Sequence, residues 1–102
     1  MFANLYKKRR GIFNNLDYNI NTLVNIIKRE DQNSEIYLFG SVLLNNYNMS
    51  SDIDILIITN NKEKIMKLLW DNSYDEPFEF HIKNKDEAKI YFRHIKNIKK
   101  LL

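Results

Sequence analysis

Two aspartates stand at the mouth of one of the most apolar segments of the chain. The stretch DIDILIIT (52–59) opens with Asp52 and Asp54 and continues as a strand that is apolar on both faces. Side chains two positions apart on a strand point to the same face, about 7 Å apart, and such like charges repel unless a cation lies between them. The pair therefore predicts a site for Mg²⁺ that is open to phosphate oxygens. The alternative is that Asp52 only caps the strand and Asp54 is an edge charge.

A Gly-Ser pair, Gly40–Ser41, closes the preceding apolar run. Glycine at the end of a strand permits close approach of another backbone or of a phosphate. Ser41 can cap the short segment SVLLNN (41–46), whose free amides would then face the same point. This cradle meets Asp52 only if the strand that ends at Gly40 runs antiparallel to the strand that follows Asp52.

The elements that must position these residues follow from hydrophobic periodicity and turn residues. The sequence predicts a helix at 14–32, strands at 35–40, 52–59 and 77–82, a helix at 61–72, and a last helix whose apolar face extends to Leu102. Asn84 and Glu87 form a capping box for that last helix, and Trp70, Tyr91 and Phe92 have core spacing. This order predicts an α+β fold of two layers, a small three-stranded sheet with helices packed on it.

A third carboxylate joins the first two through the expected topology. A right-handed crossover through the helix at 61–72 makes the strand at 77–82 parallel to the strand at 52–59. In that register Glu79 lies level with Asp54, each being third in its strand. Asp75 and Glu76 are competing candidates, but they precede the strand. Three carboxylates and an anion cradle would then converge on one point.

The bulk composition limits the classes of function. The 102 residues form one domain, 1–102, in which residues 1–12 are expected to be a loosely attached basic segment. The chain has no cysteine, which excludes disulfides and cysteine-ligated metals. Its apolar runs are far shorter than the roughly 20 residues of a membrane span. The N-terminus is a poor signal peptide, so we expect a cytoplasmic protein. Nucleic-acid binding rests only on two Lys/Arg runs and is the weakest hypothesis.

The segment FGSVLLNNYNMSSDIDILI (39–57) resembles the Gly-Ser…Asp-x-Asp signature of the DNA polymerase β-like nucleotidyltransferase superfamily. It is most similar to the minimal nucleotidyltransferases of that superfamily, in which a serine usually precedes the first aspartate, as Ser51 does here. The resemblance implies the polymerase β-like fold. Three features depart from the family pattern: Val42, Leu43 and Leu44 replace its usual basic residue, Asn45 replaces its usual glycine, and Glu79 replaces its usual aspartate. Asn45 is expected to keep the left-handed turn that a glycine commonly makes in the family.

The resemblance also implies an activity, the transfer of a nucleoside monophosphate, as AMP from ATP, to a hydroxyl with the help of two Mg²⁺ ions. Asp52 and Asp54 would bind both metals, and Glu79 would hold the catalytic metal and help to deprotonate the acceptor. Gly40, Ser41 and Ser51 would hold the nucleotide. Two metals of this kind can clamp the attacking and leaving oxygens together. His81 shares a strand face with Glu79 and could contact a nucleotide or acceptor, but we favour an ordinary, partly exposed histidine.

The family resemblance implies a partner as well. Minimal nucleotidyltransferases resemble the antitoxin half of two-gene modules and are paired with HEPN-type RNase toxins, some of which they adenylylate on tyrosine. The chain has no room for the helical substrate-binding domain of larger relatives, so the acceptor platform must come from a partner protein or from a second copy. The rival hypothesis is a non-catalytic binding module that keeps the fold and neutralises a toxin by contact alone.

Overall fold

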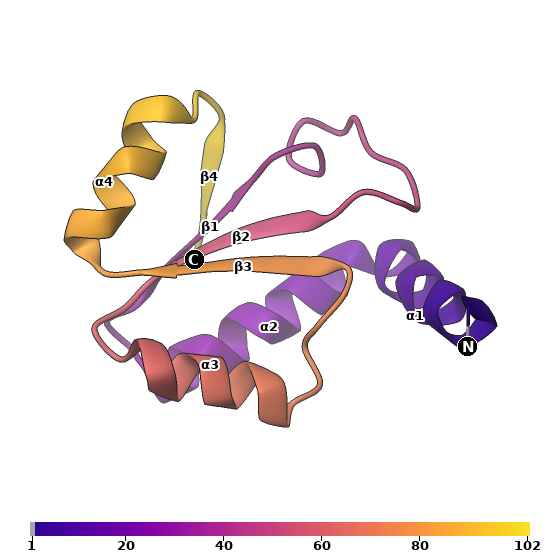
Figure 1. Ribbon diagram of the computed structural model, residues 1–102, viewed down its shortest axis with the longest axis horizontal. Helices are drawn as coiled ribbons and strands as arrows, with labels where there is room; N and C mark the ends of the chain where they lie inside the picture. The colour runs from indigo at the N-terminus through magenta and orange to yellow at the C-terminus, as the bar shows by residue number, and fades with distance from the viewer. Residues whose placement is uncertain (1) are drawn as a thin grey trace.

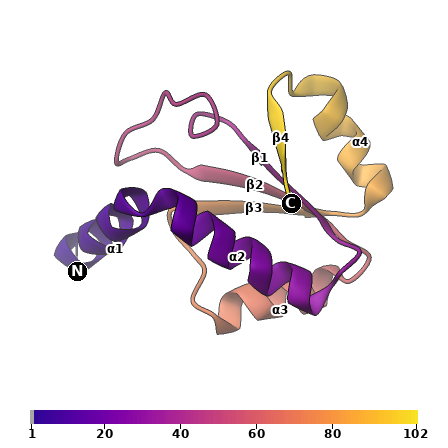
Figure 2. The ribbon, with the colours of Figure 1, turned by 180° about the vertical axis from the view of Figure 1, so that it is seen from behind.

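The computed structural model describes residues 2–102 as a four-stranded sheet with helices on both faces (Figures 1 and 2). Its elements are, in chain order, α1 (Phe2–Asn14), α2 (Leu16–Glu30), β1 (Glu35–Phe39), β2 (Ile53–Ile58), α3 (Lys62–Asp71), β3 (Phe78–Lys83), α4 (Lys85–His94) and β4 (Ile98–Leu101). None of the helices over this described part of the chain is sufficiently long and apolar to span a bilayer. The α+β class expected from the sequence is confirmed.

The sheet has the order β3-β2-β1-β4, which places β2 in the interior. β2 is antiparallel to β1 and parallel to β3, as the sequence predicts. A parallel neighbour needs a crossover connection, which α3 supplies. Because this register sets Asp54 opposite Glu79, the two carboxylates lie at the same level of adjacent strands.

The two faces of β2 are buried under different helices, since alternate side chains point to opposite sides of a strand. One face packs against the apolar stripes of α2 and α3 and contains the larger core. Its fully or nearly fully buried members are Ile20, Leu23, Val24, Ile27, Ile36, Leu38, Val42, Ile53, Ile55, Ile57, Ile65, Leu69 and Phe78. The other face packs against α4 through a smaller cluster of Phe39, Leu56, Ile58 and Ala88. Asp54 belongs to this second face of β2, which α4 covers only in part.

The C-terminal segment differs from the sequence-based expectation. The last helix ends at His94 rather than continuing to Leu102, and Ile98–Leu101 forms a strand paired antiparallel with β1. β1 would otherwise be an edge strand with unpaired backbone groups. Because β4 satisfies those groups, the sheet has four strands and the prediction of three was wrong. The predicted capping box is confirmed: Asn84 Oδ1 accepts from Glu87 N–H, and Glu87 Oε1 accepts from Asn84 N–H, both at 2.9 Å.

Trp70 was expected in the core, and the structure shows that this was wrong. Its side chain is 81% exposed on the outer side of α3, whereas Ile65 and Leu69 carry the buried stripe of that helix. Tryptophan's position differs from that of Leu69 by about 100° around a helix of 3.6 residues per turn. The apolar stripe of α3 is therefore narrower than the sequence suggested.

Candidate active site

Asp54 lies beside Gly40 at the open end of the smaller core. Gly40 follows β1 with a φ of +82°, in the left-handed region that favours glycine. A Cβ on Gly40 would lie 3.2 Å from Cγ of Asp54 and would overlap its Oδ2. The antiparallel pairing of β1 and β2, in which Phe39 faces Asp54, produces this approach. The Gly-Ser turn and the second aspartate are thus brought together, as the sequence predicts.

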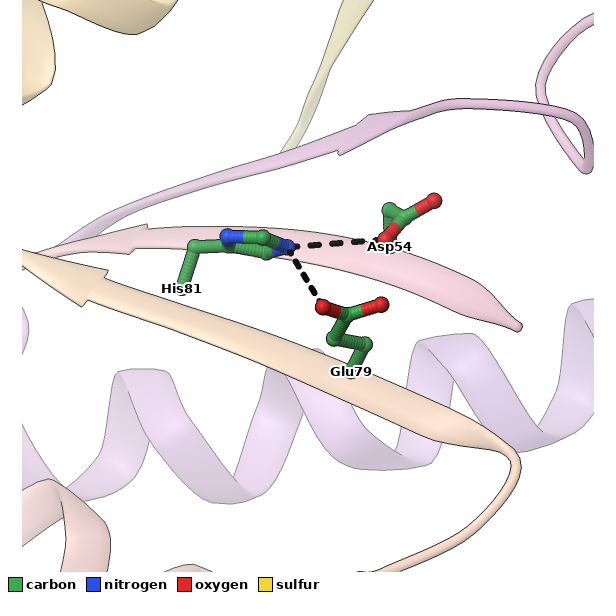
Figure 3. A group of neighbouring side chains, drawn as sticks. All are labelled: Asp54, Glu79 and His81. Atoms are coloured by element: carbon green, nitrogen blue, oxygen red, sulfur yellow. Dashed lines mark hydrogen bonds and ion pairs between the residues drawn. The ribbon is translucent and has the colours of Figure 1, made fainter.

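Glu79 and His81 complete a cluster around Asp54 (Figure 3). Nε2 of His81 lies 3.5 Å from Oδ1 of Asp54 and 3.9 Å from Oε1 of Glu79. One donor atom from each of the three residues lies within 4.8 Å of the others. The cluster contains two carboxylates and one imidazole, which is a chemically suitable donor set for a divalent cation.

Aromatic side chains hold the imidazole of His81 in place. Its Nδ1 lies 3.0 Å from the Tyr91 hydroxyl on α4, and its ring packs against Phe39 and Tyr91 with centroids 5.1 and 5.4 Å away. The side chain is 23% exposed. Sequence reasoning favoured an ordinary histidine here, but the structure makes it a neighbour of both carboxylates. The available signal was the alternation of Glu79 and His81 on one strand face.

The electrostatics of Asp54 fit a cation. Burial raises the pKa of the Asp54 carboxyl above its usual value, and the nearby charge of Glu79 raises it further, while the polar contact with His81 acts in the opposite direction. The ionised carboxylate is thus held in an unfavourable setting by the fold itself. A divalent ion between Asp54 and Glu79 would remove the repulsion, so the residues present fit a metal.

Asp52 lies outside this cluster. It precedes β2 in the loop, its side chain is 53% exposed, and its Oδ1 lies 3.8 Å from an Nη of Arg9. Arg9 comes from α1 and is mostly buried; it donates to the Met49 carbonyl at 2.8 Å and to the Ser51 carbonyl at 2.6 Å. The arginine therefore holds the loop that delivers Asp52. Sequence reasoning did not single out Arg9, because these contacts join positions about 40 residues apart.

The other carboxylates near β3 are also engaged by α1. Asp75 pairs with Lys8, and Glu76 lies 3.9 Å from Arg9. Neither belongs to the cluster around Asp54, so β3 supplies that cluster with Glu79, the residue favoured from the sequence. Glu76 and Asp52 instead line a groove of about 720 Å³ beside α1, together with Leu5, Tyr6, Arg9, Met49 and Ser50.

The loop after Gly40 is a series of tight turns rather than a helix. Leu44 N–H donates to the Gly40 carbonyl at 3.3 Å, and Asn46 N–H donates to the Ser41 carbonyl at 3.0 Å. Asn45 has a φ of 57°, which confirms the predicted left-handed turn. Ser51 closes a turn at the other end of the loop between β1 and β2, because its Oγ accepts from Asn48 N–H at 3.0 Å. Gly40 therefore borders the cluster and Ser41 follows it in the turn, whereas Ser51 is part of the loop held by Arg9.

Comparisons with known proteins agree with this geometry. A sequence model of the nucleotidyltransferase domain matches residues 20–102. A crystal structure of a protein assigned as a nucleotidyltransferase is 32% identical and superimposes with a TM-score of 0.65, covering 82% of this chain and 98% of its own. A second such protein, from Sulfolobus solfataricus, is 23% identical with a TM-score of 0.52, covers 79% of this chain and 72% of its own, and supports the fold alone. A search of curated proteins gives no significant match.

Proposed function

Because this chain belongs to the nucleotidyltransferase domain family, we propose that it transfers a nucleoside monophosphate, AMP from ATP, to a hydroxyl acceptor with the help of Mg²⁺, and that pyrophosphate is released. Membership implies an NTP substrate and a divalent metal in general. The observation that carries the finer proposal is the register pair of Asp54 and Glu79 beside the positive-φ Gly40. That arrangement joins a carboxylate pair to a backbone turn free of a side chain, as a metal-bound phosphate requires.

Asp54 and Glu79 would hold the metal, which supplies charge neutralisation for the phosphates when bound. Asp54 is fixed by the strand and by its contact with Gly40, while Glu79 is more exposed and can also accept the proton of the acceptor hydroxyl. Two ions would require Asp52 as well. Its carboxylate is half-exposed and only loosely paired with Arg9, so it can turn toward the cluster.

The nucleotide would lie over the turn at Gly40 and Ser41. Absence of a Cβ at Gly40 lets the Asp54 carboxylate lie directly against this turn, so a metal held by Asp54 would lie close to it. Ser51 would contribute through the loop that it closes with Asn48 rather than through a free hydroxyl. The segment Val42–Leu44 carries no cation, so Arg9 is the basic group nearest to Asp52 that the described contacts provide.

The acceptor would be a hydroxyl of a partner protein, and by family resemblance we propose a HEPN-type toxin or a second copy of the chain. The described part of the chain is one sheet with four helices and contains no separate acceptor platform. An antitoxin role follows if the modified partner loses its activity. The alternative function is a non-catalytic module that neutralises the toxin by contact, which the cation-free segment Val42–Leu44 favours.

Nucleotide binding and transfer test the two alternatives. We expect ATP to bind in the presence of Mg²⁺, and α-³²P-labelled ATP to label the partner encoded by the neighbouring gene. Asp52→Asn with Asp54→Asn should abolish both, whereas Asp71→Asn, on the exposed side of α3 and paired with Lys67, should abolish neither. If ATP does not bind with Mg²⁺ present, and the double variant still neutralises the toxin, the enzymatic function is excluded and the binding module stands.

A further inference from the structure

We propose that His81 is a third metal ligand of this centre and gives it a preference for Zn²⁺ and Co²⁺ that two carboxylates alone would not give. The inference shares with the proposed function only the cluster of Asp54, Glu79 and His81. It concerns which metal ion binds there and not which reaction follows. Its carrying observation is that Nε2 of His81 is directed at both Asp54 and Glu79 (Figure 3).

The distances favour a ligand over a simple hydrogen bond. Nε2 of His81 and Oδ1 of Asp54 are 3.5 Å apart, which is beyond the usual range of about 2.7–3.2 Å for an N–H···O bond. Ligand atoms that each lie about 2.1 Å from one metal ion are about 3 Å or more from one another. The three donor atoms, all within 4.8 Å, thus have the spacing of a ligand set that needs only a small contraction.

Nδ1, the second ring nitrogen of His81, has an oxygen partner, as the second ring nitrogen does in histidines that bind metals. Such histidines donate their other N–H to an oxygen, which orients the ring and leaves the first nitrogen free to bind. The Tyr91 hydroxyl, 3.0 Å from Nδ1, can accept that hydrogen because a hydroxyl both donates and accepts. Phe39 and Tyr91 restrict the ring from its sides. The imidazole is therefore preorganised, and its Nε2 lone pair can face the carboxylates.

The chemistry of the donor set decides which ion is favoured. Mg²⁺ prefers an all-oxygen shell and retains several waters, whereas imidazole nitrogen suits Zn²⁺, Co²⁺ and related ions. Adding one imidazole to two carboxylates raises affinity for the transition metals without helping Mg²⁺. His81 would thus act as a specificity-determining residue for the metal.

The test uses metal alone, without nucleotide. We expect Zn²⁺ to shift the Nε2 resonance of His81 in a long-range ¹H–¹⁵N NMR spectrum of the whole chain. The chain has two histidines, and the His94→Asn variant assigns the signals because that side chain is exposed at the end of α4. Tyr91→Phe should retain the Zn²⁺ shift but broaden or move the Nδ1 signal, as expected of a positioning residue.

Affinity gives an independent measurement. Titration calorimetry should show that His81→Asn weakens binding of Co²⁺ and Zn²⁺ by about tenfold or more. The affinity of the same variant for Mg²⁺ should change by less than about threefold, because the amide oxygen of the new asparagine suits that ion. Circular dichroism of the variant should match that of the native chain. The inference is overturned if the Nε2 signal does not respond to Zn²⁺, or if His81→Asn binds Co²⁺ as the native chain does. Failure of ATP binding would contradict the proposed function and leave these metal measurements standing.

Discussion

Gly40 lies directly against the carboxylate of Asp54, so closely that a single added Cβ would overlap Oδ2. The two residues come from neighbouring strands whose antiparallel pairing brings the end of β1 to the start of β2. Glycine therefore has two separate roles at position 40. It accommodates the positive φ, and it leaves space for the acidic group that the proposed chemistry requires.

Gly40→Ala should lower the free energy of unfolding by at least about 1 kcal/mol, because the new side chain meets both a left-handed backbone and the Asp54 carboxylate. The Gly40→Ala variant should also lose Mg²⁺-dependent ATP binding. Urea denaturation and calorimetry measure the two effects. Gly11→Ala is the matched control: nothing lies within 4 Å of its Cβ position in α1, so it should stabilise by about 0.5–1 kcal/mol. Equal effects at the two positions would contradict the close contact.

Asp54→Asn should stabilise the metal-free protein by about 0.5–1 kcal/mol at neutral pH while abolishing metal binding. Burial and Glu79 raise the pKa of Asp54 above its usual 3.8, so the ionised form disfavours the folded state above that raised pKa. As pH falls through it, the native carboxyl takes up a proton and the advantage of the variant should disappear. Urea denaturation in EDTA across this pH range is the measurement. A variant less stable than the native chain at pH 7 would show that the His81 contact outweighs the repulsion.

Arg9→Lys should loosen the loop before β2 and lower the free energy of unfolding by about 1–2 kcal/mol. A planar guanidinium donates to the carbonyls of Met49 and Ser51 together, and an ammonium does not reproduce that geometry. Amide hydrogen exchange in residues 48–52 should increase in the variant. Arg10→Lys, whose side chain is exposed on the same helix, serves as the control and should leave both the exchange and the stability unchanged.

Tyr37→Phe should reduce stability in a pH-dependent way. The Tyr37 hydroxyl donates to Oε1 of Glu35 at 2.9 Å and, as the largest cause, lowers the pKa of that carboxyl below its usual 4.5; Lys100 adds to the effect. A lowered carboxyl pKa contributes stability that is present above pH 4.5 and is lost as pH falls through the folded-state value. The difference between variant and native chain should therefore shrink on acidification, as thermal denaturation at a series of pH values can show.

The corresponding control is Tyr18→Phe, at a hydroxyl that is largely exposed on α2. It should show no such pH-dependent difference. A constant deficit for Tyr37→Phe at every pH would mean that the Glu35 contact is not its cause, and that ring packing against Phe92 has been disturbed instead.

Much of the fold follows from local patterns. The apolar positions of α2 recur at helical spacing and occupy the core, and the segment after Asp54 is apolar on both faces because helices cover both sides of β2. Together with the crossover rule, these patterns place Glu79 opposite Asp54. Hydrophobic periodicity gave wrong predictions for the side chain of Trp70 and for the edge of the sheet at β1. Trp70 lies just outside the buried stripe of α3, and Ile98–Leu101 joins β1 instead of extending α4.

The sequence by itself determined the order of the central elements and the pairing of Asp54 with Glu79, because hydrophobic periodicity marks the strands and the crossover rule makes the two strands parallel. Only the tertiary structure decided that Asp52 stands apart beside Arg9 and that His81 faces both carboxylates. Arg9 reaches its loop across about 40 positions of chain, and His81 is oriented by Tyr91 from a different element. Such contacts form only after the sheet and helices have packed and brought distant residues together, so local sequence patterns do not predict them.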